Sequence, residues 1–333
     1  MKIMRLIVAV LATILALITA CNQNDGKKAM ASPNEQTVTY GAGRFVIDIP
    51  LSMQYRGGSF HARYCELEEI VWPDTDSIHH AEAIWQERLE EIKHINPPKG
   101  KDHVIIDIID FPSVGKWCKG VFYYKEPKDP KRGYIDLLLD SGPTGLWIRF
   151  SADAQEKEKI IAFMTKIAKA YRPPAQRLGK ATVLKNVDSF YLEYGAIDLP
   201  FKYKESAYIG FEGHRLDKDL ELSVETRVIH KEKKAGLLER AAASIASNYA
   251  PGVKLEKIRS GKRTVAGLEG EELIEIARED DEESLSFAWM YLGKVDSGHY
   301  PNVVISMDSG AKEREQKIAS WDSILNSMRP AGR

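Results

Sequence analysis

The sequence predicts an α+β protein made of two tandem, duplicated domains, each an antiparallel sheet packed against helices. Strand-like runs are separated by turns rich in Gly, Asp and Pro, which favours hairpins and antiparallel pairing. Amphipathic helices fall at matching places in the two halves. Short motifs also recur in the same order about 150 to 157 residues apart, which indicates duplication. The recurring motifs are 44–50 (RFVIDIP) with 194–200 (YGAIDLP), Asp-Ser-Gly at 140–142 with 296–298, and Arg-Pro at 172–173 with 329–330.

Composition agrees with a folded protein and argues against one function class. The 333 residues carry 47 Lys and Arg against 48 Asp and Glu, a formal net charge of −1. Without a basic excess there is no global field to attract phosphates, so we expect no nucleic-acid partner. The content of 44% hydrophobic and 29% charged residues is that of a globular chain. A chain of this length usually divides into two domains.

The first 20 residues have the pattern of a secretory signal peptide. Lys2 and Arg5 supply a basic start, and residues 6–20 form a short apolar run that ends in small residues before Cys21. Residues 18–21 (ITAC) resemble the bacterial lipobox, in which the cysteine becomes the lipidated first residue. A conventional signal peptide with a chance cysteine is the alternative.

Lipidation of Cys21 would place the mature protein on a membrane. Three acyl chains exceed the two signals that stable anchoring needs. By resemblance to the sorting rule of enteric bacteria, Asn22 in place of aspartate directs the lipoprotein to the periplasmic side of the outer membrane. We therefore expect a signal peptide at 1–20, a lipidated flexible tether at 21–38, a first domain at 39–174, a linker at 175–186 and a second domain at 187–333.

The first half follows the order ββαββββα. A helix begins after Asp76, because Ile78, Ala81, Trp85, Leu89 and Ile92 share one helical face. The closing helix has a candidate capping box in Asp153 and Glu156 and presents Ile160, Met164, Ile167 and Tyr171 on one face. The expected strands are 45–49, 60–71, 104–111, 117–124, 134–139 and 146–150.

The second half repeats this scheme. Its helices are expected at 237–249 and at the end of the chain, where Ile318, Trp321, Leu325 and Met328 lie on one face. Its expected strands are 190–199, 208–211, 220–229, 255–265, 271–277, 285–292 and 303–307.

The sequence contains no recognisable catalytic motif. There is no Gly-x-Ser-x-Gly pentapeptide, so Ser141 and Ser297 in the Asp-Ser-Gly motifs are interpreted as turn residues. His79 and His80 are adjacent and would point in different directions on a helix. Metal-ligand spacings and phosphate-binding loops are also missing from the sequence. We expect no enzyme activity, cofactor, metal or small-molecule substrate.

Two cysteines remain after Cys21, and both lie in expected strands. An oxidising periplasm would permit a disulfide between Cys65 and Cys118. Two buried free thiols are the alternative, since cysteine is often buried without a partner.

One acidic run stands out between two expected strands. Glu279, Asp280, Asp281, Glu282 and Glu283 follow Arg278. The run is either a solvated hairpin tip that resists edge aggregation or an acidic surface that docks a basic patch of a protein partner. Cation binding is a weaker alternative, because the run lacks the alternating ligand spacing of a calcium loop.

The chain resembles the two-domain immunity lipoproteins that are paired with type VI secretion phospholipase effectors of class 4. The residues that carry the resemblance are 43–50 (GRFVIDIP), 197–200 (IDLP), Trp321 and 329–330. The resemblance implies a periplasmic protein that binds a toxic lipase between two domains and holds it inactive. It offers no catalytic residues. A non-catalytic envelope lipoprotein acting as a scaffold or assembly module is the alternative, followed by a hydrolase with an unrecognised site.

Overall fold

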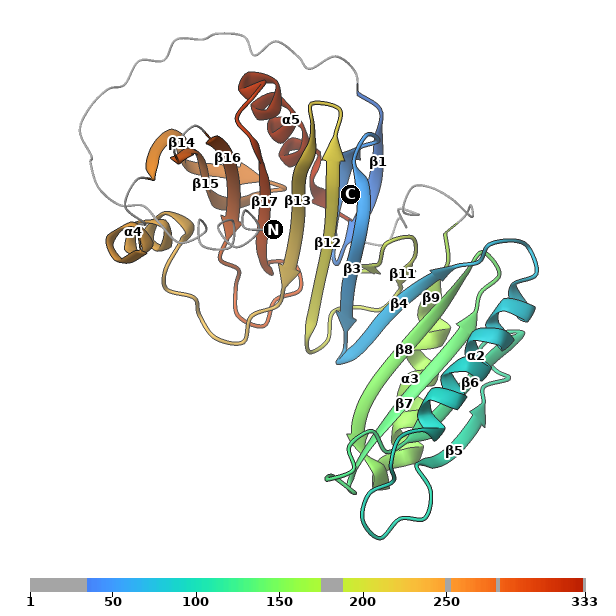
Figure 1. Cartoon of the computed structure of the whole chain (residues 1–333). Coiled ribbons are helices and arrows are strands. Elements are labelled where there is room, and N and C mark those ends of the chain that lie inside the picture. Colours follow the sequence, from blue (N-terminus) through green and yellow to red (C-terminus); the bar gives the residue numbers. More distant parts are fainter. Residues whose placement is uncertain (1–34, 175–187, 249–252, 280–281, 332–333) are drawn as a thin grey trace. The chain divides into compact units, whose positions relative to one another are not determined.

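The computed structural model describes residues 35–174, 188–248, 253–279 and 282–331, which separate into two compact units. The first unit consists of Thr39–Val46, Gly58–Ala207 and the residues from Pro330. The second unit consists of the residues up to Val38, Ile47–Gly57 and Tyr208–Arg329. Both contain antiparallel strands and helices, which confirms the predicted α+β class (Figure 1).

The first unit is built on an antiparallel sheet with the strand order β3-β4-β8-β7-β6-β5. Only the end of β3, from Gly58, belongs to this unit. In chain order the elements are β3 (Gln54–Ala62), β4 (Cys65–Val71), α2 (Ser77–Lys93), β5 (Ile105–Asp110), β6 (Trp117–Tyr123), β7 (Arg132–Asp140), β8 (Thr144–Asp153), the 3₁₀ turn η2 (Ala154–Glu156) and α3 (Lys157–Ala170).

Helices α2 and α3 cover opposite faces of this sheet. On one face, Trp85 of α2 stacks on Trp147 of β8, with ring centroids 6.3 Å apart. On the other face, Phe163 of α3 packs against Phe150 of β8. Residues three apart on a strand point to opposite faces, so the sheet is buried on both sides. As the helical periodicity predicts, α2 buries Ala81, Trp85, Leu89 and Ile92, while Ile78 is exposed.

The second unit repeats the connectivity of the first. Its sheet has the order β12-β13-β17-β16-β15-β14, and helices α4 and α5 occupy the places of α2 and α3. This repeated order supports the duplication that the recurring motifs predict. The elements are β12 (Glu205–His214), β13 (Asp217–Arg227), α4 (Leu237–Asn248), β14 (Lys254–Val265), β15 (Leu268–Glu279), β16 (Glu282–Tyr291), β17 (Asn302–Gly310) and α5 (Arg314–Ser327).

Each unit includes a short segment from the other half of the chain. Residues 47–57 belong to the second unit, and residues 188–207 belong to the first. The units therefore differ from the predicted ranges 39–174 and 187–333 in these two segments. The predicted linker at 175–186 lies outside the described residues.

Short strands mark these exchanged segments. The first unit has a small sheet of the order β10-β11-β9, in which Ala196 and Ile197 pair with Arg172 and Tyr171. A second small sheet has the order β1-β2-β18. The strands are β1 (Thr37–Ala42), β2 (Phe45–Pro50), β9 (Tyr171–Arg172), β10 (Phe190–Tyr191), β11 (Ala196–Ile197) and β18 (Arg329–Pro330).

The structure corrects three local predictions. The expected strand 60–71 is a hairpin, because the chain turns at Arg63 and Tyr64 between β3 and β4. The expected strand 190–199 is divided into β10 and β11. Asp153 caps the 3₁₀ turn by accepting from the Gln155 N–H, so it does not form a capping box with Glu156. None of the helices in the described ranges is both long and apolar enough to cross a membrane.

Candidate functional site

Glu279, Glu282 and Glu283 of the acidic run lie at the end of a long hairpin. Strand β15 ends at Glu279 and β16 begins at Glu282, and these two residues are register partners. Arg278 neutralises part of the run, since its side chain pairs with Glu283 at 2.5 Å and with Glu256 at 2.6 Å. Asp280 and Asp281 lie outside the described residues. The hairpin is therefore present as predicted, while a docking role for it remains a prediction.

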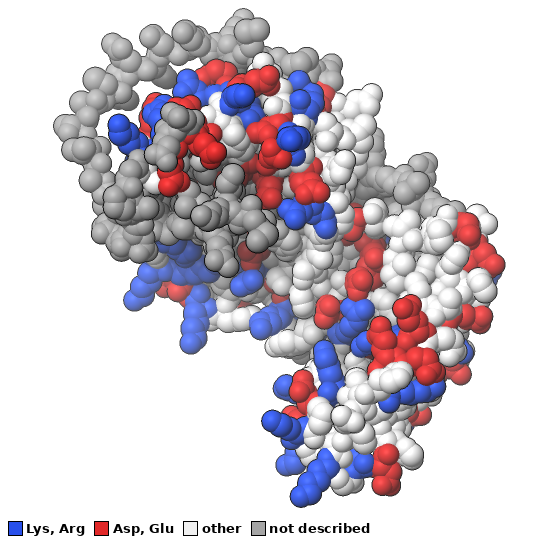
Figure 2. Space-filling model, in the orientation of Figure 1, with Lys and Arg blue, Asp and Glu red and all other residues white. Residues whose placement is uncertain are grey.

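Charge on the surface is mixed rather than segregated. On the face drawn in Figure 2, basic and acidic side chains lie next to one another in both units. This distribution follows the near balance of the whole sequence, with 47 basic and 48 acidic residues.

Cys65 and Cys118 are both buried free thiols in the structure. Cys65 lies on β4 and Cys118 on β6, and strands β8 and β7 lie between them in the sheet. Three strand spacings amount to about 14 Å, whereas bridged cysteines have Cα atoms less than about 7 Å apart. The sheet order thus keeps the two thiols apart. Burial raises the pKa of the Cys118 thiol to about 12 and that of Cys65 further, so both are protonated and unreactive. Cys21 lies outside the described residues.

The opening motif of the first half contains the most buried ion pair of the first unit. Arg44 makes a two-pronged contact with Glu205, its Nε and Nη2 each donating to a carboxylate oxygen at 2.8 Å, and both side chains are 4% exposed. Arg44 also donates to the carbonyl oxygens of Asp188 and Leu199. One arginine therefore holds the segment 188–205 in the first unit.

The next residues of the same motif join the second unit. Asp48 pairs with Arg329 at 3.0 Å, and its backbone N–H donates to Ser327 Oγ at 2.9 Å. The motif residues Asp48 and Arg329 thus meet although they lie 281 positions apart. In this structure, Arg44, Asp48 and Arg329, which carry the family resemblance, form ion pairs that hold the fold together.

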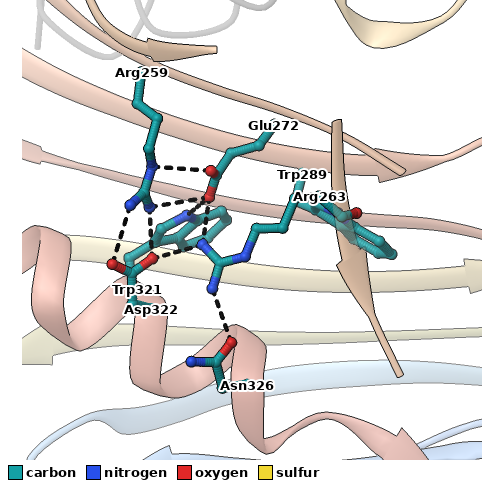
Figure 3. A network of polar contacts seen from close by, with 7 residues as sticks. All are labelled: Arg259, Arg263, Glu272, Trp289, Trp321, Asp322 and Asn326. Carbon is teal, nitrogen blue, oxygen red and sulfur yellow. Dashed lines mark hydrogen bonds and ion pairs between the residues drawn. The ribbon is translucent and has the colours of Figure 1, made fainter. Parts of the chain in front are cut away.

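Trp321, which also carries the resemblance, lies in a polar network that fixes α5 to the sheet (Figure 3). Its indole N–H donates to Glu272 at 2.8 Å. Arg263 donates to Glu272 at 2.6 Å and to Asp322 at 2.5 Å. Arg259 contacts the same two carboxylates at 2.9 and 2.5 Å. Two arginines and two carboxylates balance in charge, so the network can be largely buried without a net charge.

Two carboxyl groups have pKa values raised to about 7. Burial raises the pKa of Glu69 to about 7, although its carboxylate accepts from the Tyr171 hydroxyl and from the N–H groups of Tyr194 and Gly195. Burial likewise raises the pKa of Glu275 to about 7. The contacts of Glu69 hold the turn at 192–195 on the first unit, which is a structural role.

The residues considered for catalysis have structural partners. Ser141 donates to the Thr144 carbonyl oxygen at 2.5 Å within the β7–β8 turn, and the Ser297 hydroxyl accepts from the Tyr300 N–H. His80 contacts Asp74 at 3.0 Å and stacks on Trp72. Among the described residues, no group of three or more His, Cys, Asp or Glu side chains is arranged to hold a metal ion.

Sequence reasoning missed one surface feature. Tyr64 and Tyr203 are exposed in the first unit, and their rings lie 5.5 Å apart. The sequence contains no turn signal at Tyr64, because the run 60–71 has neither Gly nor Asn.

Comparison with known proteins agrees with the predicted family. The model of the Tle cognate immunity protein 4 C-terminal domain matches residues 190–331. No curated protein matches the sequence.

Three solved structures share the fold over 89% of this chain. They are the apo immunity protein TplEi of the type VI secretion system from Pseudomonas aeruginosa (19% identity, 97% of that chain, TM-score 0.72), a chain of the Tle4–Tli4 complex (18% identity, 98%, TM-score 0.72) and TplEi with "L" peptide (18% identity, 99%, TM-score 0.65). The sequence resemblance and the domain match thus lead to the same family. The family model matches residues 190–331, and the solved structures extend the similarity of fold to the first half of the chain.

Proposed function

We propose that this chain is a periplasmic immunity protein that binds a type VI secretion lipase effector and holds it inactive. The observation that carries the proposal is the family match of residues 190–331, together with a fold shared over 89% of the chain with a structure of the Tle4–Tli4 complex. In this proposal the producer is protected because the chain occupies the lipase, and the chain performs no chemistry of its own.

The chemistry of the described residues supports a binding role rather than a catalytic one. Arg44, Asp48 and Trp321, which carry the family resemblance, are engaged in ion pairs and hydrogen bonds that hold the fold together. The two carboxyl groups with pKa values raised to about 7, Glu69 and Glu275, lie in separate units. We infer that the chain itself is not an enzyme and requires no cofactor.

Inhibition of the lipase encoded beside this chain's gene tests the function. Purified lipase is mixed with increasing amounts of the mature chain, and phospholipid hydrolysis is measured. We expect activity to fall in proportion to the chain added and to vanish at about one chain per lipase. Unchanged hydrolysis together with no detectable complex would reject the immunity function and favour an envelope scaffold. Hydrolysis of phospholipid by the chain alone would instead indicate an enzyme.

Lipid anchoring through Cys21 is the second part of the proposal. Cells fed an alkyne fatty acid should label the wild-type protein, and Cys21→Ser should lose both the label and its retention in the membrane fraction. The reason is that the thioether-linked acyl chains supply the membrane affinity. Cys65→Ser is the matched control, because that thiol is buried on β4 and should not affect labelling. Label that survives Cys21→Ser would remove the anchor.

The acidic hairpin should affect the rate of binding more than the lifetime of the complex. We expect replacement of Asp280, Asp281 and Glu282 by Ser to slow association with the lipase at low salt, because charge complementarity mainly steers encounter. Glu283 is kept, since its carboxylate pairs with Arg278. Stopped-flow binding measures both rates, and the difference from wild type should shrink in high salt. Equal association rates at low salt would leave the hairpin as a solvated turn.

A further inference from the structure

Two exposed tyrosines of the first unit pack against each other although they come from different loops. Tyr64 lies in the β3–β4 turn and Tyr203 lies just before β12. Their ring centroids are 5.5 Å apart and the rings are tilted by 35°. They are 55% and 46% exposed, so each ring presents a large apolar area to solvent.

The backbone at both tyrosines is in a conformation that disfavours tyrosine. The φ angles are 71° at Tyr64 and 69° at Tyr203, and the neighbouring Arg63 has a φ of 55°. Hairpin turns of this kind normally use Asn-Gly or a similar pair, because a side chain in the left-handed region meets the backbone. Strained residues that persist at the surface are often found at functional sites. Tyrosine at these two positions is therefore unfavourable for the backbone by itself.

Arg63 holds the β3–β4 turn, which carries Tyr64, against the segment that carries Tyr203. It is buried, its backbone N–H donates to the Lys204 carbonyl oxygen at 2.9 Å, and its guanidinium donates to the Pro200 carbonyl oxygen at 2.7 Å. These bonds fasten the β3–β4 turn to the segment that carries Tyr203. The two rings are consequently ordered before any partner arrives, which lowers the entropy cost of binding.

The charge next to the rings is positive. The Lys202 ammonium lies 4.6 Å from the centroid of the Tyr203 ring. Lys202 and Lys204 are both exposed. The adjacent carboxylate of Glu205 is buried in its pair with Arg44 and does not offset this charge at the surface. The patch thus combines two rigid aromatic rings with two ammonium groups.

We propose that Tyr64 and Tyr203, flanked by Lys202 and Lys204, form a docking patch for an acidic segment of the lipase effector. This proposal rests on the proposed function. Ordered, exposed tyrosines are the side chains that dominate protein interfaces, and the lysines select carboxylates on the partner. A phospholipid surface is a weaker fit, because stable membrane attraction needs a larger basic cluster than two lysines.

Glycine variants separate a binding role from a structural role. Tyr64→Gly and Tyr203→Gly remove the ring and also relieve the left-handed strain. We expect thermal stability to stay equal or rise, while affinity for the neighbouring lipase, measured by calorimetry, falls about tenfold or more for each variant. Tyr64→Phe and Tyr203→Phe should retain affinity, because the ring remains.

A matched control is available in the second unit. Tyr300 is 43% exposed and the Lys294 ammonium lies 4.2 Å from its ring centroid, but its backbone is not left-handed and no second ring is paired with it in the ring contacts of the described residues. Tyr300→Ala should bind the lipase as wild type does.

The outcomes distinguish this proposal from the function on which it rests. If wild type does not bind the lipase, the proposed function fails. If wild type binds and both glycine variants bind equally well, the function stands and the patch is rejected. If the glycine variants keep lipase affinity but lose flotation with phosphatidylethanolamine and phosphatidylglycerol vesicles, the patch is a lipid contact and the proposal is overturned.

Discussion

A fragment of residues 187–333 is expected to fold poorly alone, and a peptide of residues 45–57 is expected to restore its folding. Residues 47–57 belong to the second unit. Ile47, Ile49 and Met53 of this segment are at most 5% exposed. Each buried side chain of this kind contributes about 1.5–3 kcal/mol, so losing all three removes an amount comparable to the stability of a whole domain, about 5–15 kcal/mol.

Urea unfolding followed by circular dichroism measures the effect. The fragment should show a broad transition at low urea, and the peptide should raise the midpoint in proportion to its concentration. A peptide with Ile47→Asp and Ile49→Asp is the control and should have no effect. A fragment that unfolds cooperatively without peptide, at the urea midpoint of the full chain, would contradict this account.

This result determines how a two-domain clamp has to be tested. The family resemblance predicts that two linked halves hold one lipase, and that separating them costs about 10²–10⁴ in affinity through lost effective concentration. A half cut at the linker also loses its exchanged segment, so weak inhibition by that half has two causes. The peptide-restored fragment isolates the contribution of linkage. Full inhibition by this restored fragment would rule out the clamp.

Arg44→Ala or Glu205→Ala is expected to destabilise the protein by about 3–5 kcal/mol, because either change leaves an unpaired charge in the first unit. Both side chains are 4% exposed, and the pair has two contacts of 2.8 Å. The double variant Arg44→Met with Glu205→Leu should recover much of this loss, since it removes both charges and keeps apolar volume. Equilibrium unfolding in urea gives each free energy of unfolding.

An exposed ion pair provides the comparison. Arg56 contacts Glu221 at 3.1 Å in the second unit, with side chains 53% and 56% exposed. Arg56→Ala should cost less than about 1 kcal/mol, because solvent screens the pair. If Arg44→Ala and Arg56→Ala lower the free energy of unfolding by similar amounts, the buried pair does not stabilise the fold more than an exposed pair does.

Elements with a regular apolar pattern could be predicted from the sequence. Helix α2 follows the expected face because Trp85, Leu89 and Ile92 repeat at helical spacing. Helix α5 follows it less well, since one of its most buried side chains is Lys317, whose ammonium contacts Asp217 at 2.7 Å. A hydrophobicity pattern cannot anticipate a buried lysine whose partner lies 100 residues away.

The proposed docking patch at Tyr64 and Tyr203 was harder to predict for a different reason. The turn at Arg63 and Tyr64 lacks the residues that normally mark a left-handed turn, so the sequence gives no sign that the chain reverses there. Because the motifs are duplicated, both halves offer equivalent partners. The sequence therefore leaves open which unit residues 47–57 and residues 188–207 pack into. The sequence therefore indicates the units and their repeated order but not the exchange of segments between halves.

The exchange also determines the order in which the protein can fold. Residues 58–207 of the first unit are contiguous, whereas the second unit joins 47–57 to 208–329. The contact of Asp48 with Arg329 spans 281 positions. Closing so long a loop adds little to the equilibrium cost, because loop entropy grows only with the logarithm of length, but contacts between distant residues slow folding. The contiguous residues 58–207 of the first unit can fold during synthesis, whereas both units are complete only after the end of the chain has emerged.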